Sequence, residues 1–349
     1  MVNFWQKLKN RVFPQKKRTR LICSEIFESM SILADGSVTC GCVDIYEGRI
    51  LGNVKEEPLR AIFDNEKYRD LRRRMLSGDL PPQCVDCPLR VRSKNGTESI
   101  KAGDIKWLQI DPAFNCNLRC PDCAFTQMRE ENYFIRPRTA ISLETFRSII
   151  DQAAPTLQHI RYHMLGEPFL NKQAGEMLRY AREKIPSVFI SIETNGTLVG
   201  PDMQKQLVDA RVDYVKFSID GASRETYGEY RRGGDFEQVF RNMKELVETR
   251  NKAGSDRPRV LWQYILFRWN DSDREIRKAQ MLAREAGVDD LYWLLTHSAG
   301  ASRRFVPGES YPIFEGEGQS LNVTIEIASR EGRPITRPAP TLEQYDPWK

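Results

Sequence analysis

The chain has 349 residues, of which 40% are hydrophobic and 29% charged, and its formal net charge is +5. This balance is typical of a soluble globular protein of about two domains. Because the sequence has neither an apolar run long enough to span a bilayer nor the apolar core of a secretory signal, we expect a cytoplasmic protein.

Residues 1–20 form a basic N-terminal arm. They carry seven Lys or Arg side chains and no acidic ones, whereas the other 329 residues hold 46 basic and 48 acidic side chains. A body so close to neutral disfavours a nucleic-acid-binding surface, so no nucleic-acid partner is expected. Phe4, Leu8 and Val12 recur at helical spacing, which fits either a helix in peripheral contact with an anionic membrane or a solvated tail.

Residues 21–95 are predicted to form a small, loop-rich domain. The Asp-Gly turn at 35–36 leads into two cysteines, and residues 58–76 have the periodicity of one helix. Because the segment has few apolar residues for a core, a metal cluster is a reasonable stabilising element. Clustered cysteines in a chain without export signals are more often metal ligands than disulfides. The available ligands are Cys23, Cys40, Cys42, Cys84 and Cys87.

From residue 104 to residue 300, strand-like and helical segments alternate, which predicts an α/β domain with a parallel sheet and right-handed crossovers. We expect the sheet to curl into a partial (β/α)6 barrel of the TIM type, with its chemistry in the loops after the strands. Residues 301–349 form a Gly- and Pro-rich C-terminal extension with one strand-like run at 321–328. The expected strands are 105–111, 159–165, 187–193, 214–220, 259–266 and 290–296, and the expected helices are 143–154, 174–184, 202–210, 236–253 and 274–286.

A second group of cysteines follows the first of these strands. Cys116, Cys120 and Cys123 have the spacing C-x3-C-x2-C in the string CNLRCPDC. A structural zinc site needs four ligands. Three thiolates without a nearby fourth fit a [4Fe–4S] cluster that keeps one iron open for a substrate or cofactor.

With this motif after the first strand of a βα barrel, residues 104–300 resemble the radical S-adenosylmethionine (radical SAM) superfamily. In that family the three thiolates hold a [4Fe–4S] cluster whose open iron binds SAM. The reduced cluster cleaves SAM to a 5′-deoxyadenosyl radical, which abstracts hydrogen from a substrate. The resemblance implies an enzyme of this kind, with a flavodoxin- or ferredoxin-type electron donor. Asp122 departs from the family, in which the residue before the last cysteine is commonly aromatic.

The resemblance also implies SAM-binding residues after later strands. LGEP at 165–168 is similar to the family's Gly-Gly-Glu motif, which binds the methionyl amine. TNGT at 194–197 and SID at 218–220 match segments that contact the SAM carboxylate and ribose, and Arg231 or Arg232 matches a carboxylate-binding arginine. The cofactor-binding residues implied are Gly166, Glu167, Thr194, Ser218, Asp220 and Asn270.

The N-terminal cysteine group resembles a SPASM/twitch-type auxiliary cluster domain. Two features depart from that family: the domain precedes the barrel, and it has fewer than the seven cysteines of a full SPASM domain. The resemblance therefore implies one auxiliary [4Fe–4S] cluster, and a four-thiolate zinc site is the alternative. The implied ligands are Cys23, Cys84, Cys87 and either Cys42, which the pattern favours, or Cys40.

The expected substrate is a small molecule such as a sugar, a nucleotide or an amino-acid derivative. The expected outcome is oxidation, epimerisation or bond formation assisted by the auxiliary cluster. One alternative is a radical SAM maturase that modifies peptides, and an alternative of another class is a non-catalytic metal-binding scaffold. No general acid or base is assigned. Candidate residues that line the barrel are Tyr162, His163, Glu193, Gln263 and His297.

Overall fold

The computed structural model describes residues 21–23, 25–40, 50–85, 90–92, 103–130, 139–296, 300–306, 309, 311–314 and 319–323. The basic arm of residues 1–20, Cys42, Cys87 and His297 lie outside the described residues. Within the described part, no helix combines the length and apolar character needed to cross a bilayer.

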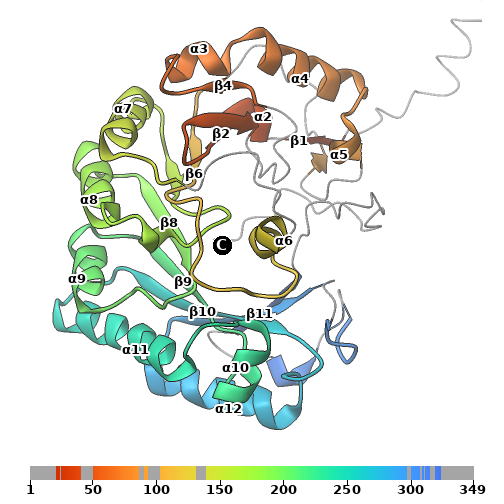
Figure 1. Ribbon diagram of the computed structural model, residues 1–349, viewed down its shortest axis with the longest axis vertical. Coiled ribbons are helices and arrows are strands. Elements are labelled where there is room, and N and C mark those ends of the chain that lie inside the picture. Colours follow the sequence, from red (N-terminus) through yellow and green to blue (C-terminus); the bar gives the residue numbers. More distant parts are fainter. Residues whose placement is uncertain are drawn as a thin grey trace, which may run out of the picture.

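Six parallel strands, adjacent in chain order, form the centre of the molecule. They confirm the predicted βα series, and they curve into an open sheet rather than a closed barrel (Figure 1). A further strand, β12 (Gln319–Val323), extends the sheet beside the last of the six. The six strands are β6 (Trp107–Ile110), β7 (His159–Arg161), β8 (Phe189–Thr194), β9 (Tyr214–Ser218), β10 (Arg259–Leu266) and β11 (Asp290–Leu295).

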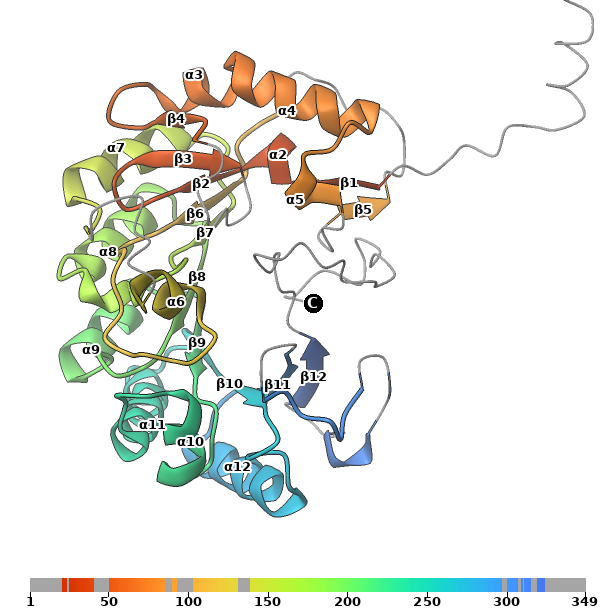
Figure 2. The ribbon, with the colours of Figure 1, turned by 45° about the vertical axis from the view of Figure 1, so that its right-hand side comes forward.

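The cysteine-rich segment contributes strands to the same sheet. Strand β2 (Ser29–Ile32) pairs in parallel with β6, β3 (Ser37–Cys40) pairs antiparallel with β2, and β4 (Gly52–Asn53) pairs antiparallel with β3. Figure 2 shows these strands running on from the barrel strands as one curved surface. The edge of β6 is therefore covered by N-terminal chain. Strands β1 (Leu21–Cys23) and β5 (Arg90–Arg92) form a separate antiparallel pair.

Five helices cover the convex face of the sheet, each within one residue of its predicted bounds (Figure 1). Their apolar stripes pack on the strands, and the side chains of Ser142, Asp235 and Ser272 each accept a backbone hydrogen bond at a helix start. These helices are α7 (Leu143–Ala153), α8 (Ala174–Lys184), α9 (Pro201–Asp209), α11 (Phe236–Lys252) and α12 (Asp273–Ala286).

The single helix predicted at 58–76 is divided into α3 (Leu59–Phe63) and α4 (Glu66–Ser77). The side chain of Asn65 accepts a hydrogen bond from the Tyr68 N–H at 3.0 Å and starts α4 as a new helix. The other helices are short and lie in connections. They are α2 (Glu25–Glu28), α5 (Pro82–Val85), α6 (Ala124–Glu130), α10 (Arg224–Tyr230), η1 (Pro168–Leu170) and η2 (Pro312–Phe314).

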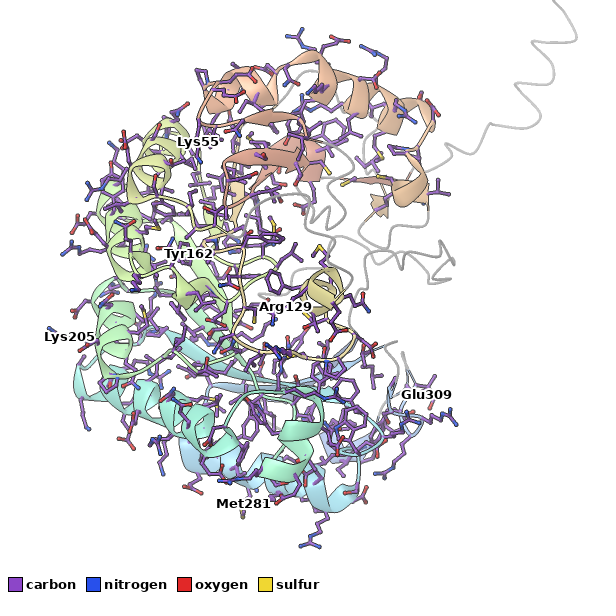
Figure 3. All side chains as sticks on the ribbon, in the orientation of Figure 1. Lys55, Arg129, Tyr162, Lys205, Met281 and Glu309 are labelled. Carbon is purple, nitrogen blue, oxygen red and sulfur yellow. The ribbon has the colours of Figure 1, made fainter. Side chains whose placement is uncertain are left out.

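The two faces of the central sheet differ in polarity. Residues that point toward the helices are buried and apolar, among them Ile160, Ile192 and Trp262. Tyr162 continues this row: its ring packs on Phe146 of α7, and its hydroxyl donates to the Met177 Sδ of α8 at 3.2 Å (Figure 3). The prediction that Tyr162 lines the barrel is therefore wrong, because the side chain points to the convex side.

Candidate active site

The loop between β6 and α6 carries Cys116, Cys120 and Cys123, at the carboxyl edge of the sheet. Helix α6 closes the loop, because the Arg129 guanidinium donates to the Cys116 carbonyl at 2.8 Å. Asp122 has a φ of 58°, a left-handed conformation that Asp tolerates better than most side chains. The departure from the family at this position therefore coincides with a turn that suits a short polar residue.

The three thiols lie in a partly buried setting that suits a cluster. Burial raises the pKa of Cys116 and raises that of Cys120 to about 11, although the Arg231 guanidinium opposes both shifts. Within the described residues, no three His, Cys, Asp or Glu side chains converge on a single metal ion. In a cubane each thiolate binds a different iron, so the three thiols need not converge on one ion.

Gly166 brings the loop after β7 against the cysteine loop. A Cβ at this position would lie 2.0 Å from the Ala113 carbonyl oxygen and 2.4 Å from that of Asn115, so only glycine fits without a shift. The next residue, Glu167, donates its N–H to the Asn115 carbonyl at 2.7 Å. The LGEP segment thus packs directly on the residue that precedes Cys116.

The Glu167 carboxylate connects the loops after β7 and β8. It is 1% exposed and accepts hydrogen bonds from Thr194 Oγ1 at 2.7 Å and from the Asn195 N–H at 2.8 Å. Burial raises the pKa of Glu167 to about 7, and these hydrogen bonds oppose the shift. Glu167 and Thr194, both expected in the SAM site, therefore lie in direct contact.

Two asparagines that the sequence analysis missed complete this contact. The Asn195 side chain donates to Asn117 Oδ1 at 2.9 Å and lies 3.9 Å from the Cys116 sulfur. Asn117 in turn donates to Thr197 Oγ1 at 2.8 Å. The sequence did contain a signal for Asn195, because this residue belongs to the TNGT string, which follows a strand predicted to lie near the cysteine loop.

A buried ion pair also contacts the cysteine loop. Asp220 is fully buried and accepts from Arg231 Nε at 2.5 Å and from the Ile265 N–H at 2.7 Å. Arg231 Nη1 lies 3.8 Å from the Cys120 sulfur. Of the two candidate arginines, Arg231 is the one that contacts this loop through its side chain, whereas Arg232 contributes its backbone carbonyl to the Arg119 N–H.

Ser218 and Asn270 lie near this pair but have different surroundings. Ser218 ends β9, and its hydroxyl is 3.4 Å from Gln263 Nε2. The Asn270 amide donates to the carbonyls of Asp220 and Ile265, at 3.0 and 2.9 Å. Since these hydrogen bonds are internal, Asn270 shapes the end of β10, and its contact with SAM stays a prediction.

The concave face below the cysteine loop is lined with polar side chains. Glu193 Oε1 on β8 lies 2.7 Å from Lys216 Nζ on β9 and 3.5 Å from His163 Nε2 after β7. Burial opposes ionisation of Glu193, but Lys216 and His163 lower its pKa to about 2, and burial lowers the pKa of His163 to about 4. Glu193, His163 and Gln263 are thus on the predicted side of the sheet.

In the N-terminal segment, three of the candidate auxiliary ligands lie in the described residues. Cys23 ends β1, Cys40 ends β3, and Cys84 belongs to α5. Cys23 and Cys40 are buried in the main apolar core, and Cys84 packs against it. Whether Cys42 or Cys40 completes the set with Cys87 stays a prediction, since Cys42 and Cys87 lie outside the described part of the chain.

Comparison with known families defines the class of protein. The profile of the radical SAM superfamily matches residues 110–293, more than half of the chain, and that of an iron–sulfur cluster-binding domain, SPASM, matches residues 23–88. The chain therefore belongs to the radical SAM superfamily. It is an enzyme family that uses a [4Fe–4S] cluster and SAM, and the SPASM domain adds auxiliary iron–sulfur binding.

Particular relatives share only part of the chain. A tungsten-containing aldehyde ferredoxin oxidoreductase cofactor-modifying protein of Pyrococcus furiosus is 28% identical over 48% of this chain and 45% of the relative. An Fe-coproporphyrin III synthase of Methanosarcina barkeri is 33% identical over 40% of this chain and 33% of its own length. A GTP 3′,8-cyclase of Desulforamulus reducens is 31% identical over 42% of this chain and 43% of the relative. The chain thus spans less than half the length of these relatives.

Solved structures with a similar arrangement include SuiB of Streptococcus suis bound to S-adenosylmethionine, with 18% identity and a TM-score of 0.43 over 54% of this chain and 40% of that one. Methylornithine synthase (PylB) has 14% identity and a TM-score of 0.37, over 71% of this chain and 65% of that one.

Proposed function

We propose that this radical SAM enzyme acts on a small polar molecule held on the concave face of the sheet, between the cysteine loop and the N-terminal strands. When bound, the cluster and SAM supply a 5′-deoxyadenosyl radical that abstracts hydrogen. The residues Gly166, Glu167, Thr194, Ser218 and Asp220 would bind SAM beside that loop.

The observation that carries the proposal is the polarity of the concave face. Strand register aligns Gln109 with Arg161, Glu193 with Lys216, and Gln263 with Tyr292. These side chains belong to the row that alternates with the buried apolar row, so they point away from the convex helices. A molecule rich in hydroxyl, amide or charged groups would replace its hydration with direct hydrogen bonds to these side chains.

Charge on this face narrows the substrate class to one with an anionic group. Lys216 is paired with Glu193, but no described carboxylate lies within ion-pair distance of Arg161, whose guanidinium lies 5.3 Å from the centre of the Trp107 ring. A planar guanidinium held on an aromatic ring presents its N–H groups to a carboxylate or phosphate. The names of the relatives, which include a GTP cyclase and a porphyrin synthase, support a small anionic substrate.

The test is anaerobic reconstitution of the full chain, followed by reduction with dithionite in the presence of SAM. We expect about eight irons per chain, the sum of two four-iron clusters, and release of 5′-deoxyadenosine. Nucleotides, sugar phosphates, amino acids and unmodified peptides are then compared for transfer of substrate deuterium into 5′-deoxyadenosine. Transfer from peptides alone would contradict the small-molecule proposal, and no SAM cleavage by the fully loaded protein would favour a non-catalytic scaffold.

Two variants separate substrate binding from general effects. Arg161→Gln should raise the KM for an anionic substrate at least tenfold and leave substrate-independent SAM cleavage unchanged. Arg179→Gln removes the same charge from a side chain of α8 that is 60% exposed, and it should change neither property. An unchanged KM in Arg161→Gln would refute the anion-binding role.

A further inference from the structure

Arg72 of α4 is a buried cation that the radical SAM site does not use. Its side chain is 0% exposed, and Nε donates to the Ile26 carbonyl at 2.8 Å. The terminal nitrogens Nη1 and Nη2 are also buried, yet they have no hydrogen-bond partner among the described residues. Buried donors without acceptors are strongly unfavourable, and most proteins avoid them. These two nitrogens therefore indicate that an acceptor is missing.

Aromatic packing accounts for only part of the environment of Arg72. The guanidinium carbon lies 4.4 Å from the centre of the Phe63 ring and 5.0 Å from that of Tyr68. Such contacts involve the face of the guanidinium, whereas its N–H groups lie in the plane and need acceptors at the edge. Burial lowers the pKa of Arg72, but an arginine stays protonated in a protein. The charge thus persists with its terminal edge unsatisfied.

The position of Arg72 suggests which acceptor is missing. Ile26, its hydrogen-bond partner, follows Cys23 by three residues. The Tyr68 hydroxyl, one turn earlier on α4, donates to the carbonyl of Thr39, the residue before Cys40, at 3.0 Å. Cys23 and Cys40 share one apolar core with Tyr68, and Cys84 packs against that core. Helix α4 is therefore anchored to both backbone segments that carry the buried cysteines, through Arg72 to the segment of Cys23 and through Tyr68 to the segment of Cys40.

We propose that Nη1 and Nη2 of Arg72 donate hydrogen bonds to the auxiliary iron–sulfur cluster, at its sulfide or cysteine sulfurs, and raise its reduction potential. An iron–sulfur cluster ligated by thiolates is anionic, and it gains a further negative charge when it takes up an electron. A fixed cation with two N–H donors favours the reduced form, because hydrogen bonds to sulfur and local charge set cluster potentials. Arg72 would thereby make the cluster a better electron acceptor.

The test isolates the auxiliary cluster in the full chain. In a parent protein with Cys116, Cys120 and Cys123 all changed to Ala, iron should bind only at the N-terminal site, at about four per chain. A potentiometric titration followed by electron paramagnetic resonance then gives the midpoint potential. We expect Arg72→Gln in this parent to make one-electron reduction at least tenfold less favourable, a shift of about 59 mV to more negative potential.

Matched variants make the outcome decisive. Arg73→Gln removes the same charge from the next residue of α4, which is 51% exposed, and should leave the potential unchanged. Arg72→Lys keeps the charge without the fork of donors and should give an intermediate potential. If Arg72→Gln fails to retain iron, the Lys variant alone decides. A potential equal to that of the parent in the iron-loaded Arg72 variants would overturn the proposal, and so would zinc in place of iron in the parent.

Discussion

Replacing Gly166 by Ala tests how tightly the LGEP segment packs on the cysteine loop. The new Cβ would lie 2.0 Å from the Ala113 carbonyl oxygen, where real contacts are essentially never below 3.0 Å, so the backbone must move by about 1 Å. The neighbouring obstacles are the Asn115 carbonyl oxygen at 2.4 Å and its nitrogen at 3.0 Å. All three are backbone atoms, so no side-chain rotation can relieve the overlap.

The loss of stability expected in Gly166→Ala follows from the contacts that Asn115 makes. Its carbonyl accepts the Glu167 N–H at 2.7 Å, and Cys116 is the next residue along the chain. Overpacking costs about 1–3 kcal/mol, and loss of this hydrogen bond about 1 kcal/mol more, so we expect a loss of about 2–4 kcal/mol in the free energy of unfolding. Because functional groups must be held within about 0.5 Å, a shift of Cys116 should prevent assembly of the radical SAM cluster.

Iron analysis after anaerobic reconstitution measures the effect. We expect the Gly166→Ala protein to fall from about eight irons per chain to about four, to lose SAM cleavage and to melt at a lower temperature. Gly228→Ala is the control, because Gly228 in α10 has no atom within 4 Å of an added Cβ, and alanine there should stabilise the helix by up to about 1 kcal/mol. Full iron content and normal SAM cleavage in Gly166→Ala would refute the reasoning.

Three further predictions address charge and backbone strain. Arg231→Met leaves buried Asp220 without its ion-pair partner and should lower the free energy of unfolding by about 3–5 kcal/mol. Urea denaturation measures this loss, and a loss below about 1 kcal/mol would contradict a tight ion pair. Burial lowers the pKa of His159 to about 3, below the value of about 6.5 that this residue has in the unfolded chain. The contribution of neutral His159 to the free energy of unfolding is therefore complete above pH 6.5 and is lost as the pH falls toward 3. From pH 7 to pH 5 the loss should be about 2 kcal/mol, and His159→Asn should flatten this part of the pH profile. Arg211 has a φ of 48° just after α9, so Arg211→Gly should raise the melting temperature, and a lower one would show that the Arg211 side chain outweighs the strain.

Local patterns predicted the elements of the barrel well. The five outer helices have an apolar stripe at helical spacing, and Ser142, Asp235 and Ser272 mark three of their starts, so periodicity and capping agree. The chemistry-bearing strings could be placed because each follows a strand, and parallel strands bring their carboxyl ends together. The contact between Glu167 and Thr194 agrees with this rule.

Long-range pairing and the direction of single side chains could not be predicted in the same way. Nothing local in residues 29–32 specifies that they pair with β6. Tyr162 was assigned to the wrong face because side chains alternate along a strand, and a shift of one residue reverses every direction. The break before α4 needed recognition that Asn65 is a cap rather than an interior residue of one long helix.

The shared sheet has a consequence for the two cysteine groups. Cys40 pairs with Met30, which pairs with Leu108 near the start of β6, whereas Cys116 lies beyond the end of β6. Because Leu108 aligns with Ile160 in the row that faces the helices, the side chains of Met30 and Cys40 lie on the convex side, whereas the cysteine loop lies at the carboxyl edge of the sheet. Joining β2 to β6 fixes the separation of Cys40 from the cysteine loop more firmly than a flexible linker between independent domains would, because β3, β2 and β6 are hydrogen-bonded in series.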